Sequence, residues 1–255
     1  MNLTLLQRPA RTPIDDFRIQ LQKECSLLES GLSAQAKISG FSQGGWVQVE
    51  VTGEDHEILE ELISRRFALA TTNLSQVELF GSYPGLVASR YNDRLDVDVG
   101  VEMPVPVRVH IGVGAMRSQL CDGRQLSVAE LTDCYCLHPE TKIVVRISGL
   151  NTRSRSIEGW FADGQIKSLS EDVALGLQCV KLYDCTRLQV ENAVKRANLE
   201  RYIVTIDSPT VTTHSVVCKL GTDAVGLIPR LGSVLRKSRL EPFIPSRVTS
   251  RCREW

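Results

Sequence analysis

A turn near the C-terminus combines residue types that can bind an anion. It contains Lys219, Gly221, Thr222 and Asp223, directly after an apolar run. Backbone amides of a glycine turn, joined by a lysine and a hydroxyl group, can cradle a phosphate. The nucleotide-binding pattern Gly-x-x-x-x-Gly-Lys-Ser/Thr is absent. We therefore favour a tight structural turn over a ligand site, with Gly221 at positive φ and Asp223 bonded to its own backbone.

Two carboxylates and one arginine in the middle of the chain could also take part in binding. Asp96 and Asp98 lie two residues apart in an alternating segment, so they share a strand face and could hold a magnesium ion or a water molecule. A solvated pair is the favoured interpretation. Arg117 could bind a phosphate or carboxylate through two parallel hydrogen bonds, or pair with Asp122 in its own loop. The sequence leaves both roles of Arg117 open.

Metal binding and nucleophilic catalysis find little support. Cys134, Cys136 and His138 form one compact cluster, whereas structural zinc sites use two separated pairs of ligands. On a helix the two cysteines would point to different sides, so buried thiols are favoured. His214 and Cys218 would lie about 13 Å apart along one strand, and no Gly-x-Ser-x-Gly motif occurs. We expect no cofactor, no metal and no catalytic residue.

The charge balance argues against a global field that recruits nucleic acid. The 30 basic residues equal the 30 acidic residues, so a polyanion would need a local patch. The basic C-terminal residues are one candidate, although a solvated helix face is favoured. They are Arg230, Arg236, Lys237, Arg239, Arg247, Arg251 and Arg253.

No apolar run reaches the roughly 18 residues that span a bilayer, and the N-terminus lacks the core of a signal peptide. We therefore expect a cytoplasmic protein without a membrane partner. In that compartment the 8 cysteines are expected to stay reduced.

The N-terminal part has the pattern of a small α+β module. Apolar residues alternate in its strand-like segments and recur at helical spacing in the others. The expected elements are a strand at 2–6, a helix at 14–32, strands at 36–41 and 46–51, and a helix at 57–69.

The C-terminal part opens with the same order of elements. We expect a strand at 174–182, a helix at 188–199, and strands at 203–206 and 215–220. The residues after Asp223 allow two interpretations. Residues 224–228 could form another strand with Pro229 opening a helix, or a helix could start at Asp223. We prefer the strand, because Gly226 and Pro229 both disfavour a helix interior.

The middle of the chain is rich in short alternating segments. Apolar residues alternate in 95–101, 105–113 and 142–147, and residues 156–161 add a further strand. A helix at 127–137 is expected, because Ser127 and Glu130 have capping-box spacing. A small barrel of the OB kind fits this pattern, and a plain β-meander stays open. The predicted domains are 1–76, 77–170 and 171–255.

Three segments resemble an uncharacterised family of archaeal proteins whose function is unknown. They are residues 96–100 (DVDVG), 116–123 (MRSQLCDG) and 218–229 (CKLGTDAVGLIP). The resemblance covers most of the chain, and the last segment is its most specific part. It implies an archaeal cytoplasmic protein and supplies no activity.

The central part also resembles the OB-type RNA-binding domains of ribosomal and exosome proteins. In that comparison residues 85–101 correspond to the first two strands, 125–131 to the third strand and helix entry, and 142–161 to the last two strands. Near the presumed binding face the only aromatic residues expected are Tyr83 and Tyr91. The resemblance implies an RNA partner.

Together these patterns predict an α+β protein with two flanking βαββ-type modules around a small central OB-like β-barrel. The leading hypothesis is a non-enzymatic factor associated with RNA or a ribonucleoprotein. Its expected nucleic-acid contacts are Arg90, Tyr91, Arg94, Arg117 and Arg230. The alternatives are a protein-interaction scaffold, and a protein or enzyme that binds a small phosphorylated ligand. The expected ligand contacts are Asp98, Lys219, Gly221, Thr222 and Asp223. The sequence makes no prediction about oligomeric state.

Overall fold

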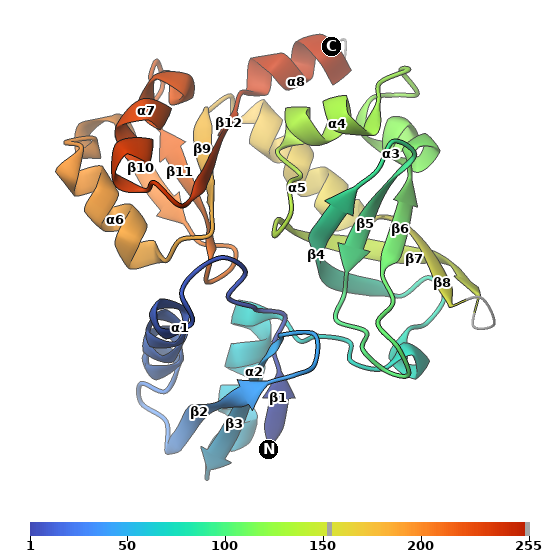
Figure 1. Ribbon diagram of the computed structural model, residues 1–255, viewed down its shortest axis with the longest axis vertical. Coiled ribbons are helices and arrows are strands. Elements are labelled where there is room, and N and C mark those ends of the chain that lie inside the picture. Colours follow the sequence, from blue (N-terminus) through green and yellow to red (C-terminus); the bar gives the residue numbers. More distant parts are fainter. Residues whose placement is uncertain (152–154, 253–255) are drawn as a thin grey trace.

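The computed structural model describes residues 1–151 and 155–252. This part of the chain forms a three-stranded sheet, a closed five-stranded barrel and a four-stranded sheet, which occupy separate regions of Figure 1. The barrel comes from the middle of the sequence and the sheets come from its two ends. The prediction of a mixed α+β protein with a central closed β-barrel and two flanking sheets is confirmed.

The N-terminal unit has the five elements expected of it. These are β1 (Asn2–Thr4), α1 (Ile14–Leu28), β2 (Ala34–Phe41), β3 (Val47–Gly53) and α2 (His56–Phe67). The strands are antiparallel in the order β1-β3-β2. Phe17 and Leu21 of α1 and Ile63 of α2 are fully buried in one apolar cluster with Val49 of β3. This shared core fixes both helices on one face of the sheet.

The C-terminal unit is a four-stranded antiparallel sheet in the order β10-β11-β9-β12. Its elements are β9 (Cys179–Tyr183), α6 (Arg187–Arg196), the 3-10 helix η2 (Glu200–Tyr202), β10 (Ile203–Asp207), β11 (Thr213–Cys218), α7 (Ala224–Val234), β12 (Arg239–Phe243) and α8 (Pro245–Cys252). Its first three strands lie in the spatial order first-third-second, as they do in the N-terminal unit. The similarity of element order seen in the sequence therefore extends to strand order.

The preferred interpretation of residues 224–228 as a strand is wrong. These residues are the first half of α7, and the alternative helix that starts after Asp223 is correct. The Asp223 carboxylate accepts hydrogen bonds from the amides of Val225 and Gly226, both at 3.1 Å. This cap satisfies two amides that have no partner inside the helix. The cap and the buried face of α7 outweigh the cost of Pro229 within the helix.

The strand expected from residue 174 begins only at β9. Ala174 is the last residue of α5 (Asp163–Ala174), and residues 175–178 form a turn and a loop before β9. The apolar side chains Ile166, Leu169 and Val173 of α5 recur at helical spacing and pack against the barrel core. The end of a helix and a loop therefore occupy the first part of the segment where the sequence predicts a strand.

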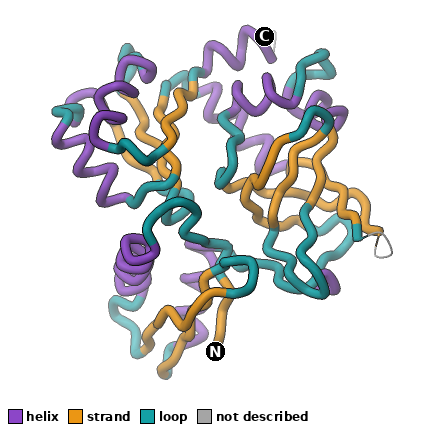
Figure 2. Tube along the Cα trace, in the orientation of Figure 1, coloured by secondary structure: helices purple, strands orange, loops and turns teal. Residues whose placement is uncertain are grey.

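The barrel closes in the order β4-β5-β6-β8-β7, and only its β6–β8 contact is parallel. In chain order its elements are the 3-10 helix η1 (Leu74–Gln76), β4 (Ser82–Arg90), β5 (Arg94–Asp98), β6 (Val109–Gly112), α3 (Val113–Leu120), α4 (Val128–Tyr135), β7 (Lys142–Asn151) and β8 (Ser156–Phe161). The capping box of Ser127 and Glu130 at the start of α4 is confirmed. Figure 2 shows α3 and α4 as two short helices at one end of the barrel strands.

One part of the OB-type alignment is wrong. Residues 125–131, matched to the third strand and helix entry, form a loop and the beginning of α4. The third strand is β6, where Val109 and Ile111 point into the barrel core. It lies within 105–113, where the alternation of apolar residues indicates a strand. Residues 142–161 do supply the last two strands, apart from 152–154, which lie outside the described residues.

The three units are joined by buried contacts. Val248 and Cys252 of α8 belong to the barrel's apolar cluster, and α8 packs against α4 and α5 (Figure 1). Gln7 connects the two ends of the chain, because its side chain donates to the Phe67 carbonyl and accepts from the Val211 amide. The domain limits after residues 76 and 170 stay a prediction.

Candidate nucleic-acid interface

Strand alternation places a row of polar side chains on the outside of the barrel. Asp96 of β5 lies opposite His110 of β6, and His110 lies opposite Glu158 of β8. Their neighbours along the strands, such as Val97 and Val109, are fully buried inside the barrel. The outer face of β5, β6 and β8 therefore presents three polar groups in one line across the strands.

Asp96 contacts two other polar side chains of this face. Only 3% of the residue is exposed, and its Oδ1 accepts a hydrogen bond from Arg94 Nε at 3.0 Å and lies 2.7 Å from His110 Nδ1. Asp98 is also paired, with Arg8 Nη1 at 3.4 Å and the Gly100 amide at 3.0 Å. The favoured expectation of a solvated carboxylate pair is therefore wrong. Nearby cations and amides satisfy both groups, and Asp96 orients Arg94 and His110.

Two hollows meet at His110. The first, of about 400 Å³, lies above β6 and β8 and includes Arg94 and Trp160 in its walls. The second, of about 500 Å³, runs toward the N-terminal unit and includes Arg8 and Arg108. His110 lines both hollows, so the barrel face is hollowed on either side of this side chain.

Exposed aromatic side chains lie near the two hollows. Trp160 on β8 is 52% exposed, and Tyr91 in the β4–β5 turn is 47% exposed with the Arg94 guanidinium 4.7 Å from its ring centre. Phe80, just before β4, is also exposed and lies 6.0 Å from the Arg146 guanidinium. Arg146 pairs with Trp160 across β7 and β8. The face thus combines planar rings with guanidinium groups.

Sequence reasoning missed Trp160 and Phe80. The signal for Trp160 was present, because the buried neighbours Ile157 and Phe161 on β8 leave position 160 on the outer face. No comparable periodicity marks Phe80, which lies in a turn. Tyr83, expected near the face, instead bonds locally: its hydroxyl accepts from the Glu78 amide and donates to the Gln76 carbonyl.

Two of the expected RNA-contacting arginines make contacts within the barrel unit. Arg90 Nη1 lies 2.6 Å from Asp133 Oδ1 and donates to Thr132 Oγ1 on α4. Arg117 donates to the Leu126 carbonyl and to the Gln125 side chain, both at 2.8 Å. Arg117 therefore holds the loop between α3 and α4. The structure brings Arg94 and Tyr91 together and directs Arg90 toward α4.

The remaining expected residues lie on the C-terminal unit. Arg230 of α7 donates to the Ala197 carbonyl, and α7 is separated from the barrel strands in Figure 1. Lys219 is exposed at the end of β11, and Gly221 adopts φ +82° in the turn before α7. Thr222 donates its amide to the Lys219 carbonyl within that turn. Asp98 lies at the end of β5 in the barrel, so the turn and Asp98 do not form one site. Arg253 of the basic C-terminal set lies outside the described residues.

The cysteine and histidine cluster is buried, as the sequence analysis favoured. All cysteines are free and buried, and burial raises the pKa of the Cys136 thiol to about 12. Burial also lowers the pKa of His138, whose Nε2 lies 4.0 Å from Glu241. Within residues 1–151 and 155–252 no group of three or more His, Cys, Asp or Glu side chains is placed to hold a metal ion.

Comparison with known families gives a match in the C-terminal unit. Residues 179–241 match the model of the DUF2110 C-terminal domain, which spans β9 to β12. The sequence resemblance to an uncharacterised family is thereby supported for this unit. No curated protein matches the chain.

Several solved structures are distantly similar. An uncharacterised protein from Methanocaldococcus jannaschii has 16% identity and a TM-score of 0.25, over 34% of this chain and 96% of its own. The alpha subunit of aIF2 from Pyrococcus abyssi has 8% identity and a TM-score of 0.25, over 66% and 97%. A chain from the a/eIF2alpha-aDim2p-rRNA complex of Pyrococcus horikoshii has 10% identity and a TM-score of 0.26, over 48% and 64%. TM-scores this low support no inference about this chain.

The helices of the described residues include none with the length and apolar character needed to cross a bilayer.

Proposed function

We propose that this protein is a non-enzymatic factor that binds single-stranded RNA across the outer face of its barrel. The observation that carries the proposal is the pair of exposed rings, Tyr91 and Trp160, beside the hollow lined by Arg94 and His110. Proteins that bind single strands stack bases on exposed aromatic side chains and follow the backbone with cations. The archaeal and cytoplasmic setting implied by the sequence resemblance stays part of this proposal.

The order of the barrel strands also supports RNA binding on this face. Its five strands close with a parallel contact between the third and fifth strands, and its helices α3 and α4 lie between the third and fourth. OB-folds are five-stranded Greek-key barrels that bind oligonucleotides on the face of their second and third strands. In this chain those strands are β5 and β6, which carry Arg94, Asp96 and His110.

The charges of the face predict a modest dependence on salt. Arg94, Arg108 and Arg146 can each contact one phosphate, while Asp93 and Glu158 line the same surface. Three phosphate contacts give a slope of about −2 for log K against log salt with single strands. Affinity should then fall about 20-fold between about 50 and about 200 mM salt. Stacking, rather than charge, would supply the larger share of the binding energy.

The test is the affinity of the purified chain for short single-stranded RNAs, measured by fluorescence anisotropy at two salt concentrations. Trp160→Ala should weaken binding by about 1–3 kcal/mol, or about 5- to 150-fold in Kd, because one base loses its stacking partner. Leu220→Ala removes an exposed apolar side chain outside the barrel and serves as the control. Equal affinities of wild type, Trp160→Ala and Tyr91→Ala would refute binding on this face.

Tryptophan fluorescence gives a second readout. A base stacked on Trp160 should quench its emission, and Trp160→Phe should bind RNA with little loss while removing that quenching. Unchanged quenching in Trp160→Phe would place the RNA elsewhere.

A further inference from the structure

A separate cavity of about 300 Å³ lies between the barrel and the C-terminal unit. Its walls come from the segment between α4 and β7, from α5, from β9 and from the β10–β11 hairpin. The apolar part of the lining includes Ile143, Leu169 and Phe243. A volume of this size, with mostly apolar walls and a few polar groups, is typical of a small-molecule site.

Lys142 is an unpaired cation in this cavity. It is half-buried at the start of β7, and within the described residues no carboxylate lies within ion-pair distance of its ammonium group. Burial, together with the nearby Arg66 guanidinium, lowers the pKa of Lys142. Removing a charge from water without a counter-charge is costly, so an anion in the cavity would relieve an existing penalty.

The other charged groups of the lining leave an excess of positive charge. Lys181 lies with Nζ 5.8 Å from the Phe243 ring centre, and Asp172 is the carboxylate among the described lining residues. Burial raises the pKa of Asp172, while Lys181 opposes that shift. Burial lowers the pKa of His214 to about 4, so its imidazole is neutral at pH 7. The cavity is therefore lined by two lysines and one carboxylate.

The hydroxyl and amide groups of the lining add donors. The Gln165 side-chain oxygen accepts from the Val144 amide at 3.0 Å, which leaves its NH₂ group to donate to a ligand. Ser168, an exposed residue, lines the same wall. Together with two ammonium groups, these donors suit a ligand group that has only acceptors and carries more than one negative charge, such as a phosphate monoester.

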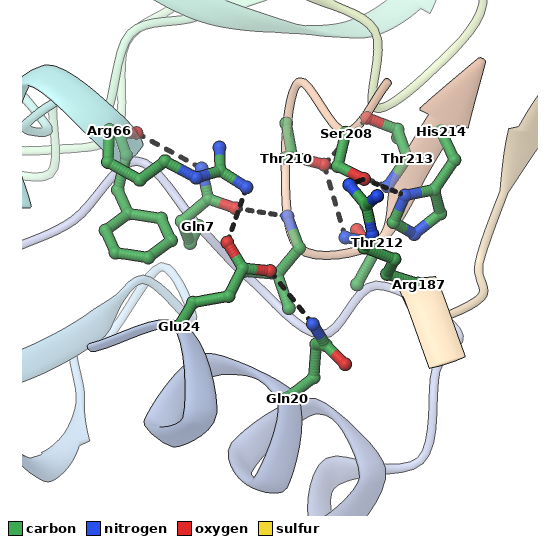
Figure 3. Close-up of polar contacts among 12 residues, drawn as sticks. Gln7, Gln20, Glu24, Arg66, Arg187, Ser208, Thr210, Thr212, Thr213 and His214 are labelled. Atoms are coloured by element: carbon green, nitrogen blue, oxygen red, sulfur yellow. Dashed lines mark hydrogen bonds and ion pairs between the residues drawn. The ribbon is translucent and has the colours of Figure 1, made fainter. Parts of the chain in front are cut away.

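One wall of the cavity is held rigid by the network in Figure 3. His214 Nε2 donates to the Cys185 carbonyl at 2.9 Å, so Nδ1 accepts from Ser208 Oγ at 2.8 Å. Thr210 Oγ1 and Thr213 Oγ1 share a hydrogen bond of 2.7 Å in the same hairpin. These contacts fix the hairpin tip, so the cavity is formed without a ligand.

We propose that this cavity binds a small phosphate monoester with a planar apolar body, of the nucleoside monophosphate type. Lys142 and Lys181 bind the phosphate, Gln165 and Ser168 donate to its oxygens, and the base lies against the apolar wall. The site is distinct from the barrel face proposed for RNA and does not depend on it. The ligand is a free nucleotide or the 5′-phosphorylated end of an RNA, which share this chemistry.

Isothermal titration calorimetry of the full chain with adenosine monophosphate, uridine monophosphate and inorganic phosphate tests the proposal. The nucleotides should bind more tightly than inorganic phosphate, and Lys142→Met should weaken nucleotide binding at least tenfold. Lys167→Met, on the exposed side of α5, is the matched control and should leave affinity unchanged. Short RNAs with and without a 5′-phosphate then separate the two sources. If the ligand is a free nucleotide, the two RNAs should bind with equal affinity, whereas a 5′-end site predicts tighter binding of the phosphorylated RNA.

The melting temperature of each variant without ligand shows whether the variant is folded. Without ligand, Lys142→Met should keep or raise the melting temperature, because it removes an unpaired, half-buried charge. Ser168→Trp, which places a large ring at the cavity mouth, should also abolish nucleotide binding. Failure of wild type to bind either nucleotide at millimolar concentration, or equal binding by Lys142→Met, overturns the proposal. The affinity for short RNAs without a 5′-phosphate should be the same in Lys142→Met and wild type, which separates this result from the test of Trp160.

Discussion

Replacing Asp223 with alanine removes the acceptor for two backbone amides at the start of α7. Both hydrogen bonds are 3.1 Å long, and the carboxylate also lies at the positive end of the helix dipole. Loss of an N-cap costs about 1 kcal/mol and up to about 2 kcal/mol, and for a charged cap about 0.3–1 kcal/mol of this comes from the helix dipole. Pro229 already removes one hydrogen bond from α7, so the capping contacts matter more for the stability of this helix. We expect Asp223→Ala to lower the free energy of unfolding by about 1–2 kcal/mol.

Urea denaturation followed by circular dichroism measures this loss. A change of this size corresponds to a melting temperature lower by about 2–8 °C for a chain of this length. Asp223→Asn keeps a good capping side chain and should lose only the dipole contribution. Lys219→Ala, at the exposed side of the same turn, should change stability by less than about 0.5 kcal/mol. If Asp223→Ala is as stable as wild type, the cap does not stabilise α7 and the turn needs another explanation.

Two further predictions concern buried charge. Burial lowers the pKa of His214 to about 4, so the unfolded chain binds the His214 proton more tightly than the folded chain. The free energy of unfolding should therefore fall as the pH drops from about 6.5 to about 4, by about 1.6 kcal/mol between about pH 6.5 and about pH 5. Urea denaturation should show a smaller drop for His214→Gln, and equal drops would contradict the assignment. Arg8 bonds Glu140 at 2.7 Å and Asp98 at 3.4 Å, so Arg8→Met should cost about 2 kcal/mol by leaving two half-buried carboxylates without their counter-charge. Equal stability of Arg8→Met and wild type would show that solvent compensates both carboxylates.

Strand alternation made most of the barrel predictable. The segment around Leu95 alternates strictly between apolar and polar residues. The segments around Ile143 and Ile157 alternate between buried and less buried positions, because one side of each strand faces a closed core. The same rule locates Asp96 and Trp160 on the outer face once the inner residues are known. Alternation does not give the partner of each outer side chain. The contact between Asp96 and His110 depends on pairing across β5 and β6, which brings together residues 14 positions apart.

The wrong assignments have local causes. Gly226 and Pro229 lower helix propensity, yet a single capping side chain and a buried apolar face decide the structure of α7. The charges of Arg90 and Arg117 suggested phosphate contacts, but arginine also bonds carbonyls and side chains of its own unit. A sequence shows that an arginine is present, whereas only the fold shows what it bonds.

The barrel is the part that both proposed sites share. The hollow of about 500 Å³ next to His110 includes Arg8 from the N-terminal unit in its walls. The nucleotide cavity includes Lys181 from the C-terminal unit. Each proposed site is therefore completed by a different flanking unit. Arg8 and Glu140 tie the first neighbour to the barrel, and the Tyr183 hydroxyl ties the second by donating to the Cys136 carbonyl at 3.0 Å. Arg8→Met should therefore weaken RNA binding without affecting nucleotide binding, and Tyr183→Phe should do the reverse. If both variants changed both affinities, the two surfaces would be one coupled site and the separate assignments would fail.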